Sequence, residues 1–264
     1  MRTNQNRLSL WARLAVRESA PSWLLSSGLG FVMAYVVFTM LLLFSVSIVI
    51  GEVDGRLPSA ATLAISGILA CVVTTIGVYQ WARQRFGRDW RSALRLSLPN
   101  RTAALLAIFL FGLGMAGLLD LIGRLTRLTG GQIVPPALSG LRSAEPATFL
   151  FALMLAVIFQ PVAEGLIFNA VLYPVLAKQT RDNRIAMLIL ALLALVVSLI
   201  ISASPGIWYA LIQPFFMALI VSGVRAYTQS ARAAVVARIA FGVFFVLIAL
   251  FSGGFSRVPN PFQG

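Results

Sequence analysis

The chain has 264 residues, of which 59% are hydrophobic and only 11% are charged, and its formal net charge is +13. A soluble domain carries a charge on about a quarter of its residues, so this composition excludes a soluble globular protein. Apolar runs longer than about 18 residues recur along the sequence, which is the length that a helix needs to cross a bilayer. Because the backbone in lipid must satisfy its own hydrogen bonds, the sequence predicts an all-α, polytopic membrane protein.

The apolar runs predict about seven transmembrane helices, at residues 23–50, 60–80, 102–122, 147–177, 185–203, 207–226 and 231–252. The first run is too long for a signal peptide and is expected to remain as a membrane anchor. The fourth contains Pro161 and Pro174, which predict a kink or a break. The chain is thus expected to comprise four regions: a basic amphipathic segment 1–22, three helices with their loops at 23–144, a four-helix core at 145–252 and a tail at 253–264.

The positions of the basic residues predict the orientation of the chain. If the spans cross the membrane in turn, fifteen of the 21 Lys and Arg residues lie on the same side of the membrane as the N-terminus, and five lie on the other side. Cytoplasmic loops are enriched in Lys and Arg, so we expect a cytoplasmic N-terminus and an outer C-terminus, in a bacterial inner membrane. No nucleic-acid partner is expected, because these charges lie in short loops where they meet lipid phosphates.

Two of the basic segments, "RLSLWARLAVR" and "WARQRFGRDWRSALRL", interleave arginine with aromatic and aliphatic residues. This pattern is typical of amphipathic helices that lie at the headgroup level of a membrane, with anionic lipids as partners. The alternative is a docking face for another protein. The residues expected to make these contacts are Arg7, Trp11, Arg13, Arg17, Arg83, Arg85, Arg88, Trp90, Arg91 and Arg95.

The chain contains no histidine. This excludes a Ser-His-Asp triad, a histidine-ligated zinc site and a histidine proton relay. Of the eight acidic residues only Glu164 lies deep in a predicted span, so no metal site and no cofactor are expected. A charge at the bilayer centre costs about 2.5–3.5 kcal/mol and usually finds a partner inside the bundle. Glu164 is therefore either a tether between helices or a catalytic or transport residue.

Residues from about 145 to 250 resemble the core of the CPBP family, which comprises the CAAX-prenyl-protease and bacteriocin-processing (Abi) intramembrane proteases. The first motif of that family, EExxxR, falls on "PVAEGLIFN". Glu164 is kept here, whereas Gly165 replaces the second glutamate and Asn169 replaces the arginine. The resemblance implies a four-helix membrane core and a site of glutamates, histidines and asparagine that activates water to cut a peptide bond.

Two further motifs of the family are present in altered form. The second, FxxxH, falls in "VVSLIISASPG", where Ser204 or Pro205 stands near the place of the histidine. The third, HxxxN/D, falls in "TQSARAAVVARIAFG", where Arg238 takes the histidine position and Gly242 the asparagine position. Only one glutamate of the implied site remains, so the resemblance implies a degenerate protease homologue that is not an enzyme.

The expected function is therefore binding, as a scaffold, assembly factor or accessory subunit for other integral membrane proteins, including a large membrane complex. A residual peptidase that uses Glu164 and a small transporter or lipid-handling protein are the alternatives. We also expect Arg238 to form an ion pair with Glu164 in place of the catalytic site, with Asn169 or Gln213 as a further partner. Two unpaired charges in the membrane would cost about 5–7 kcal/mol, which favours this pairing.

Overall fold

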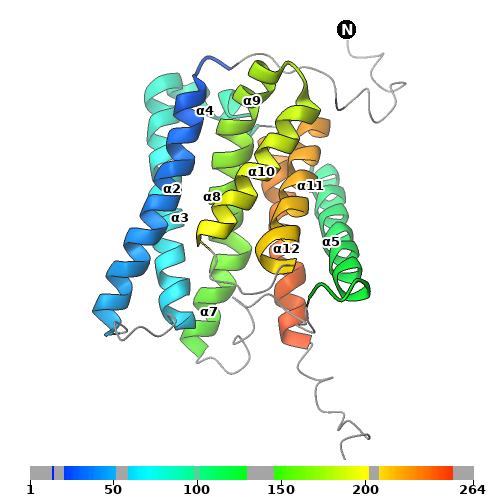
Figure 1. The fold of residues 1–264 in the computed structure, drawn as a ribbon. Helices are drawn as coiled ribbons and strands as arrows, with labels where there is room; N and C mark the ends of the chain where they lie inside the picture. Colours follow the sequence, from blue (N-terminus) through cyan, green and yellow to red (C-terminus); the bar gives the residue numbers. More distant parts are fainter. Residues whose placement is uncertain are drawn as a thin grey trace, which may run out of the picture.

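The computed structural model describes residues 14, 21–51, 59–97, 99, 101–129, 146–201 and 208–251. All regular secondary structure in these ranges is helical, as the sequence predicted (Figure 1). The first three predicted spans are the helices α2 (Leu25–Ile50), α3 (Ala60–Phe86) and α5 (Thr102–Leu125). The fourth is a continuous helical run of α7 (Pro146–Met154), η3 (Leu155–Phe159), α8 (Gln160–Glu164), η4 (Gly165–Leu172) and α9 (Tyr173–Thr180).

The last three predicted spans follow in the same way. They are α10 (Asn183–Ile201), η5 (Trp208–Ile212) continued by α11 (Gln213–Thr228), and α12 (Ala231–Phe251). In the described part of the chain, six helices are long and apolar enough to cross a membrane, and the run from η5 to α11 is the additional predicted span. The chain is an all-α, polytopic integral membrane protein.

The prolines inside the spans follow π-helical segments, and the helical run of the fourth span continues through Pro161 and Pro174 without a break. The segments η3, η4 and η5 are π-helical, and each ends two residues before a proline, namely Pro161, Pro174 and Pro214. A proline has no N–H, and its ring clashes with the carbonyl four residues earlier in an α-helix. The wider π turn shifts hydrogen bonding to the fifth residue, which moves that carbonyl away from the ring.

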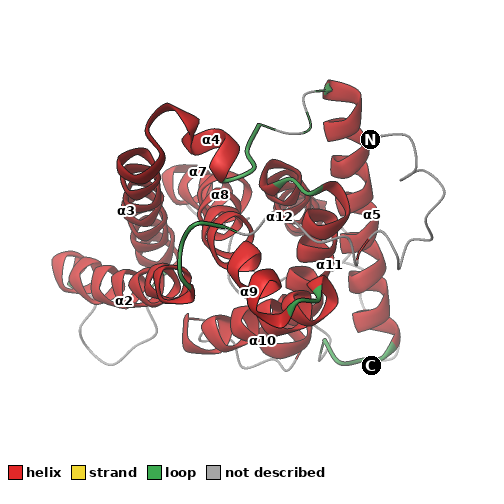
Figure 2. Ribbon diagram, turned by 90° about the horizontal axis from the view of Figure 1, so that it is seen from above, coloured by secondary structure: helices red, strands yellow, loops and turns green. Residues whose placement is uncertain are grey.

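The fourth span and α12 lie side by side at the centre of the bundle, in contact along η3, α8 and η4 (Figure 2). The helices α2 and α3 pack on one side of this central pair, and α5 packs against α12 on the other side. The bundle is completed by α10 and α11, which contact each other as well as α9 and α12, respectively. The fourth and seventh predicted spans are therefore neighbours.

The second basic segment forms a helical corner at the same end of the bundle as the start of α2 (Figure 1). Here α3 continues through a 3₁₀ turn, η2 (Gly87–Asp89), into the short helix α4 (Trp90–Ala93). The predicted lipid-facing arginines at this corner are exposed: Arg83, Arg85, Arg88 and Arg91. Arg95 is half-buried, and the ring of Trp90 packs edge-on against Tyr79. The other expected contact residues, Arg7, Trp11, Arg13 and Arg17, lie outside the described residues, as do Ser204, Pro205 and the tail at 253–264.

A glycine in α5 allows this helix to pack closely against α12. A Cβ atom at Gly112 would lie 2.8 Å from the Cβ of Ala240 and 2.9 Å from the carbonyl oxygen of Ala237. A Cβ atom at Gly114, on the same helix, would have no neighbour within 4 Å. The two glycines thus form a matched pair, in which one position is a helix contact and the other is open.

We expect Gly112→Ala to lower the thermal unfolding midpoint of the protein in detergent micelles, because α5 must move away from α12. Overpacking of this kind costs about 1–3 kcal/mol. Gly114→Ala is the control and should leave the midpoint unchanged or raise it slightly, because alanine favours a helix over glycine by about 1 kcal/mol. Equal shifts for the two variants would show that the α5–α12 contact does not contribute to stability.

Candidate functional site

Glu164 and Arg238 meet at the centre of the bundle. Glu164 ends α8, and Arg238 lies about two turns into α12. The Nε and Nη2 atoms of Arg238 each lie 2.9 Å from Oε2 of Glu164, so the guanidinium binds this carboxylate oxygen through two donors. The side chains of Arg238 and Glu164 are 12% and 19% exposed, respectively. The two charges are therefore paired and largely shielded from the outside of the bundle.

The third member of this cluster is Gln160, which was not among the partners expected for the ion pair. Its Nε2 donates a hydrogen bond of 2.7 Å to Oε1 of Glu164, so both carboxylate oxygens have a donor. The two residues are four apart in one helical turn, which places them on the same face of the helix. Asn169 and Gln213 were expected as further partners of the ion pair. Among the described residues, neither forms a hydrogen bond with Glu164 or Arg238.

Two of the altered motif positions are contacts between helices. Gly165 begins η4, and a Cβ atom there would overlap the side chain of Val235 in α12. A Cβ atom at Gly242 in α12 would overlap the carbonyl oxygen of Ala156 in η3. The resembled proteases have a glutamate and an asparagine at these positions. Glycine at both positions brings α12 close to the fourth span, and Arg238 then reaches Glu164.

The remaining polar groups near the ion pair come from α2 and α3. The side chains of Tyr35 and Cys71 interact with each other and lie within electrostatic range of Glu164 and Arg238. Cys71 is only 1% exposed, whereas reactive thiols are partly exposed in electropositive surroundings. Cys71 is therefore a core residue, and no group of three potential metal ligands occurs among the described residues.

Arg225 is a buried basic residue near the end of a span. Its side chain is fully buried in the last turn of α11. The Nε atom donates a hydrogen bond of 3.0 Å to the carbonyl oxygen of Asn169 in η4, and the guanidinium lies 5.3 Å from the ring centroid of Tyr173. Asn169 is five residues before Pro174, the spacing of a π hydrogen bond, and the proline has no N–H to donate. Arg225 supplies that missing donor.

A second carbonyl of η4 has a donor from outside its helix. The indole Nε1 of Trp23, just before α2, donates a hydrogen bond of 2.9 Å to the carbonyl oxygen of Val171. Two carbonyls of η4 thus accept side-chain hydrogen bonds, one from α11 and one from the residue Trp23 that precedes α2. The signal for the bond from Arg225 in the sequence was Pro174, which removes a main-chain donor near the end of the fourth span.

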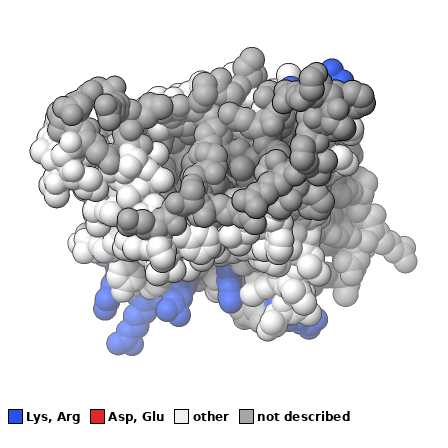
Figure 3. All heavy atoms as spheres, turned by 90° about the horizontal axis from the view of Figure 1, so that it is seen from below, with Lys and Arg blue, Asp and Glu red and all other residues white. Residues whose placement is uncertain are grey.

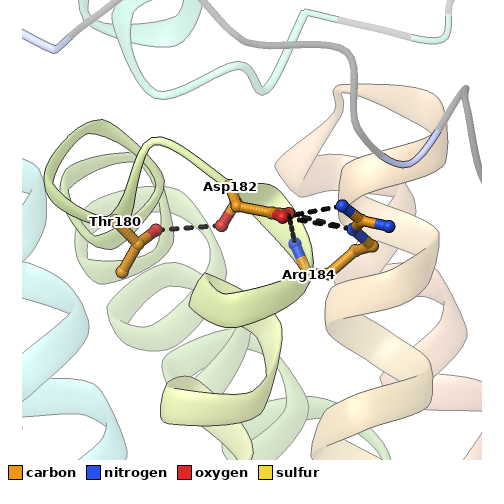
Figure 4. Close-up of polar contacts among 3 residues, drawn as sticks. All are labelled: Thr180, Asp182 and Arg184. Atoms are coloured by element: carbon orange, nitrogen blue, oxygen red, sulfur yellow. Dashed lines mark hydrogen bonds and ion pairs between the residues drawn. The ribbon is translucent and has the colours of Figure 1, made fainter.

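The ion pair of Asp182 and Arg184 contrasts with the central pair (Figure 4). Its side chains are 27% and 50% exposed, and it lies at the connection between α9 and α10. The carboxylate of Asp182 also accepts a hydrogen bond from the backbone N of Arg184, and its carbonyl accepts one from Thr180 Oγ1 (Figure 4). This pair therefore shapes the turn between α9 and α10.

The fold and the central cluster define an integral membrane protein with one carboxylate and one guanidinium paired between its helices. Residues 146–251, from α7 to α12, match the model of the family described as "Type II CAAX prenyl endopeptidase Rce1-like". The match lies over the segment whose motifs resemble the CPBP family, and it confirms that resemblance. No curated protein and no solved structure matches the chain.

A double-mutant cycle measures the coupling between Glu164 and Arg238. We expect Glu164→Gln and Arg238→Met each to lower the thermal unfolding midpoint in micelles, because each leaves a buried charge without its partner, at a cost of about 3–5 kcal/mol. The double variant should be more stable than the sum of the two single effects predicts.

The control cycle combines Asp182→Asn with Arg184→Gln. Its effects should be close to additive, because exposed pairs are screened by solvent. Additive effects in the Glu164 and Arg238 cycle as well would show that the central pair makes no net contribution to stability.

A second cycle tests the role of Arg225. Arg225→Met should lower the unfolding midpoint, because a buried carbonyl without a donor costs about 1–3 kcal/mol. In a Pro174→Ala background the same substitution should have a smaller effect, because alanine at 174, in α9, restores a main-chain N–H for the carbonyl of Asn169 in η4. Arg101→Met, at the exposed start of α5, is the control. An equal loss in both backgrounds would show that Arg225 does not compensate for the proline.

Proposed function

We propose that this protein is a non-catalytic relative of the intramembrane proteases. In this proposal it acts as a scaffold, assembly factor or accessory subunit that binds other integral membrane proteins, including a large membrane complex. The observation that carries the proposal is the ion pair of Glu164 with Arg238. An arginine at the histidine position of the family motif binds the carboxylate that would otherwise serve as the base.

The chemistry of peptide hydrolysis supports this interpretation. Activation of water requires a base with a free lone pair, and the transition state requires donors for the oxyanion. Both carboxylate oxygens of Glu164 already accept hydrogen bonds, from Arg238 and Gln160, and these donors compete with a water for the lone pairs of the carboxylate. The chain has no histidine to replace this base, and a second glutamate at Gly165 would overlap Val235.

The surface of the bundle is suited to helix–helix contacts within the membrane. The helices α2 and α5 lie at opposite edges of the bundle (Figure 2). Both expose large apolar side chains, among them Met33, Phe44, Leu106 and Leu110. Helices associate in lipid through close packing and occasional polar contacts, so these edges are where we place the partner proteins.

We further propose a bacterial inner membrane location with a cytoplasmic N-terminus and an outer C-terminus. The exposed arginines of the corner between α3 and α4 support this orientation, since they lie at the same end of the bundle as the start of α2 (Figure 1). When the bundle is viewed from its other end, the Lys and Arg side chains that can be seen lie at the edge of the described surface (Figure 3). Arginines placed in this way also favour anionic lipids on the N-terminal side.

A purification from cells tests the proposal with two readouts. In cells that carry Glu164→Leu together with Arg238→Leu, we expect the same membrane proteins to co-purify in mild detergent as with the wild-type chain. Replacing a buried ion pair by apolar residues is often neutral for stability, so the binding surface should persist. We also expect the termini of the membrane proteins in these cells, measured by mass spectrometry, to be unchanged.

The controls are a tagged unrelated membrane protein and the variant Glu164→Gln. A wild-type chain that always purifies alone would contradict a scaffold or subunit role. Membrane proteins that are cut in wild-type cells but remain whole in Glu164→Gln cells would instead establish the residual peptidase.

A further inference from the structure

An apolar groove with a volume of about 390 Å³ lies between α3 and α12. Its floor is formed by Val162 and Leu166 of the fourth span, and its walls include Ile76 and Val235. Ile76 is 48% exposed, whereas Val78 and Leu94, which also line the groove, are buried. The groove therefore has a buried interior and an open side, and that side faces outward from the bundle, where a membrane would place lipid.

The connection after α4 passes over one end of this groove. Leu94 and Leu96 line the groove there, and the backbone N of Ala231 donates a hydrogen bond of 3.1 Å to the carbonyl oxygen of Arg95. This bond ties the connection to the first residue of α12. The tied end lies at the basic corner, at the depth where the headgroups of the nearest lipid leaflet would stand.

Basic and aromatic side chains gather at the same end. Arg232 lines the groove, is exposed, and forms no hydrogen bond or ion pair with another described residue. Arg83 donates a hydrogen bond of 3.0 Å to the hydroxyl of Tyr79, and the guanidinium of Arg91 lies 5.3 Å from the ring centroid of Trp90. Tyr79 and Trp90 both line the groove and pack edge-on, with ring centroids 5.2 Å apart.

The charges at this end favour an anion. The segment 83–95 contains five arginines and a single acid, Asp89. An exposed arginine that has no charge partner among the described residues, at the mouth of an apolar groove, is suited to a ligand with an anionic head and an apolar tail. Tyr and Trp are also the residues that collect at the level of lipid headgroups.

We propose that the groove binds one acyl chain of an anionic phospholipid whose phosphate is bound by Arg232. The lining accepts a chain of methylene groups, and the guanidinium of Arg232 provides charge-assisted hydrogen bonds to the phosphate. A helix of a partner protein is about 10–12 Å across and would rest on the rim of the groove rather than enter it. The bound lipid would join the α3–α4 corner to α12, independently of the Glu164–Arg238 pair and of the proposed scaffold role.

Lipid binding to the delipidated full chain in mild detergent tests this proposal by native mass spectrometry. The probes are dipalmitoyl phosphatidylglycerol and dipalmitoyl phosphatidylcholine, which share their acyl chains and differ in net charge. We expect one molecule of phosphatidylglycerol to bind more tightly than phosphatidylcholine. Arg232→Gln should weaken phosphatidylglycerol binding by about tenfold, the value of one charge-assisted hydrogen bond. Arg101→Gln removes the same charge away from the groove and should bind as the wild type does.

A second variant tests the apolar part of the site. Ile76→Trp narrows the groove from its exposed rim, where folding should be preserved, and we expect it to weaken the binding of both lipids. Inorganic phosphate should not displace phosphatidylglycerol, because the acyl chain contributes to binding. Unchanged phosphatidylglycerol binding in both Arg232→Gln and Ile76→Trp would overturn the proposal, as would full displacement by inorganic phosphate. A cross-link from position 76 to a partner helix, without bound lipid, would also overturn it in favour of a protein ligand.

Discussion

The close crossing of α12 and the fourth span determines where the charges of this protein lie. It depends on Gly165 and Gly242, where any side chain would overlap the facing helix. At this separation Arg238 reaches the carboxylate of Glu164 with two donors. With the helices further apart, each of the two charges would face apolar side chains or lipid, at a cost of about 2.5–3.5 kcal/mol. The same two glycines therefore fix the packing and allow the ion pair.

The prolines of the fourth span explain why this helix needs support from its neighbours. Pro174 leaves the carbonyl of Asn169 without a main-chain donor at the π spacing, and the buried Arg225 provides one. The carbonyl of Ala156 stands in the same relation to Pro161, and it is the atom against which Gly242 packs. Residues that differ from the protease motifs thus lie where the widened helix meets the rest of the bundle.

The positions of the spans could be predicted from the sequence because the length of an apolar run directly reflects the thickness of a bilayer. The motif comparison likewise identified the segment at 146–251 that matches the protease family. The burial of Arg225 could not be predicted, because a basic residue near the end of a span resembles a loop arginine until the helices are packed. The bond of Gln160 to Glu164 could not be predicted for a related reason. Its partner depends on which face of a π-interrupted helix turns inward, and periodicity does not specify that face.

The central claim is that an ion pair occupies the place of a reaction centre. Its most direct test is solid-state NMR on the protein reconstituted in bilayers, with labels on the guanidinium nitrogens of Arg and on the side-chain carboxyl carbons of Glu. The measured quantity is the dipolar coupling between these nitrogens and carbons. The N–O distances of 2.9 Å between Arg238 and Glu164 predict a strong coupling that disappears in both Glu164→Gln and Arg238→Met. A spectrum without this coupling, or one that neither substitution changes, would contradict the account.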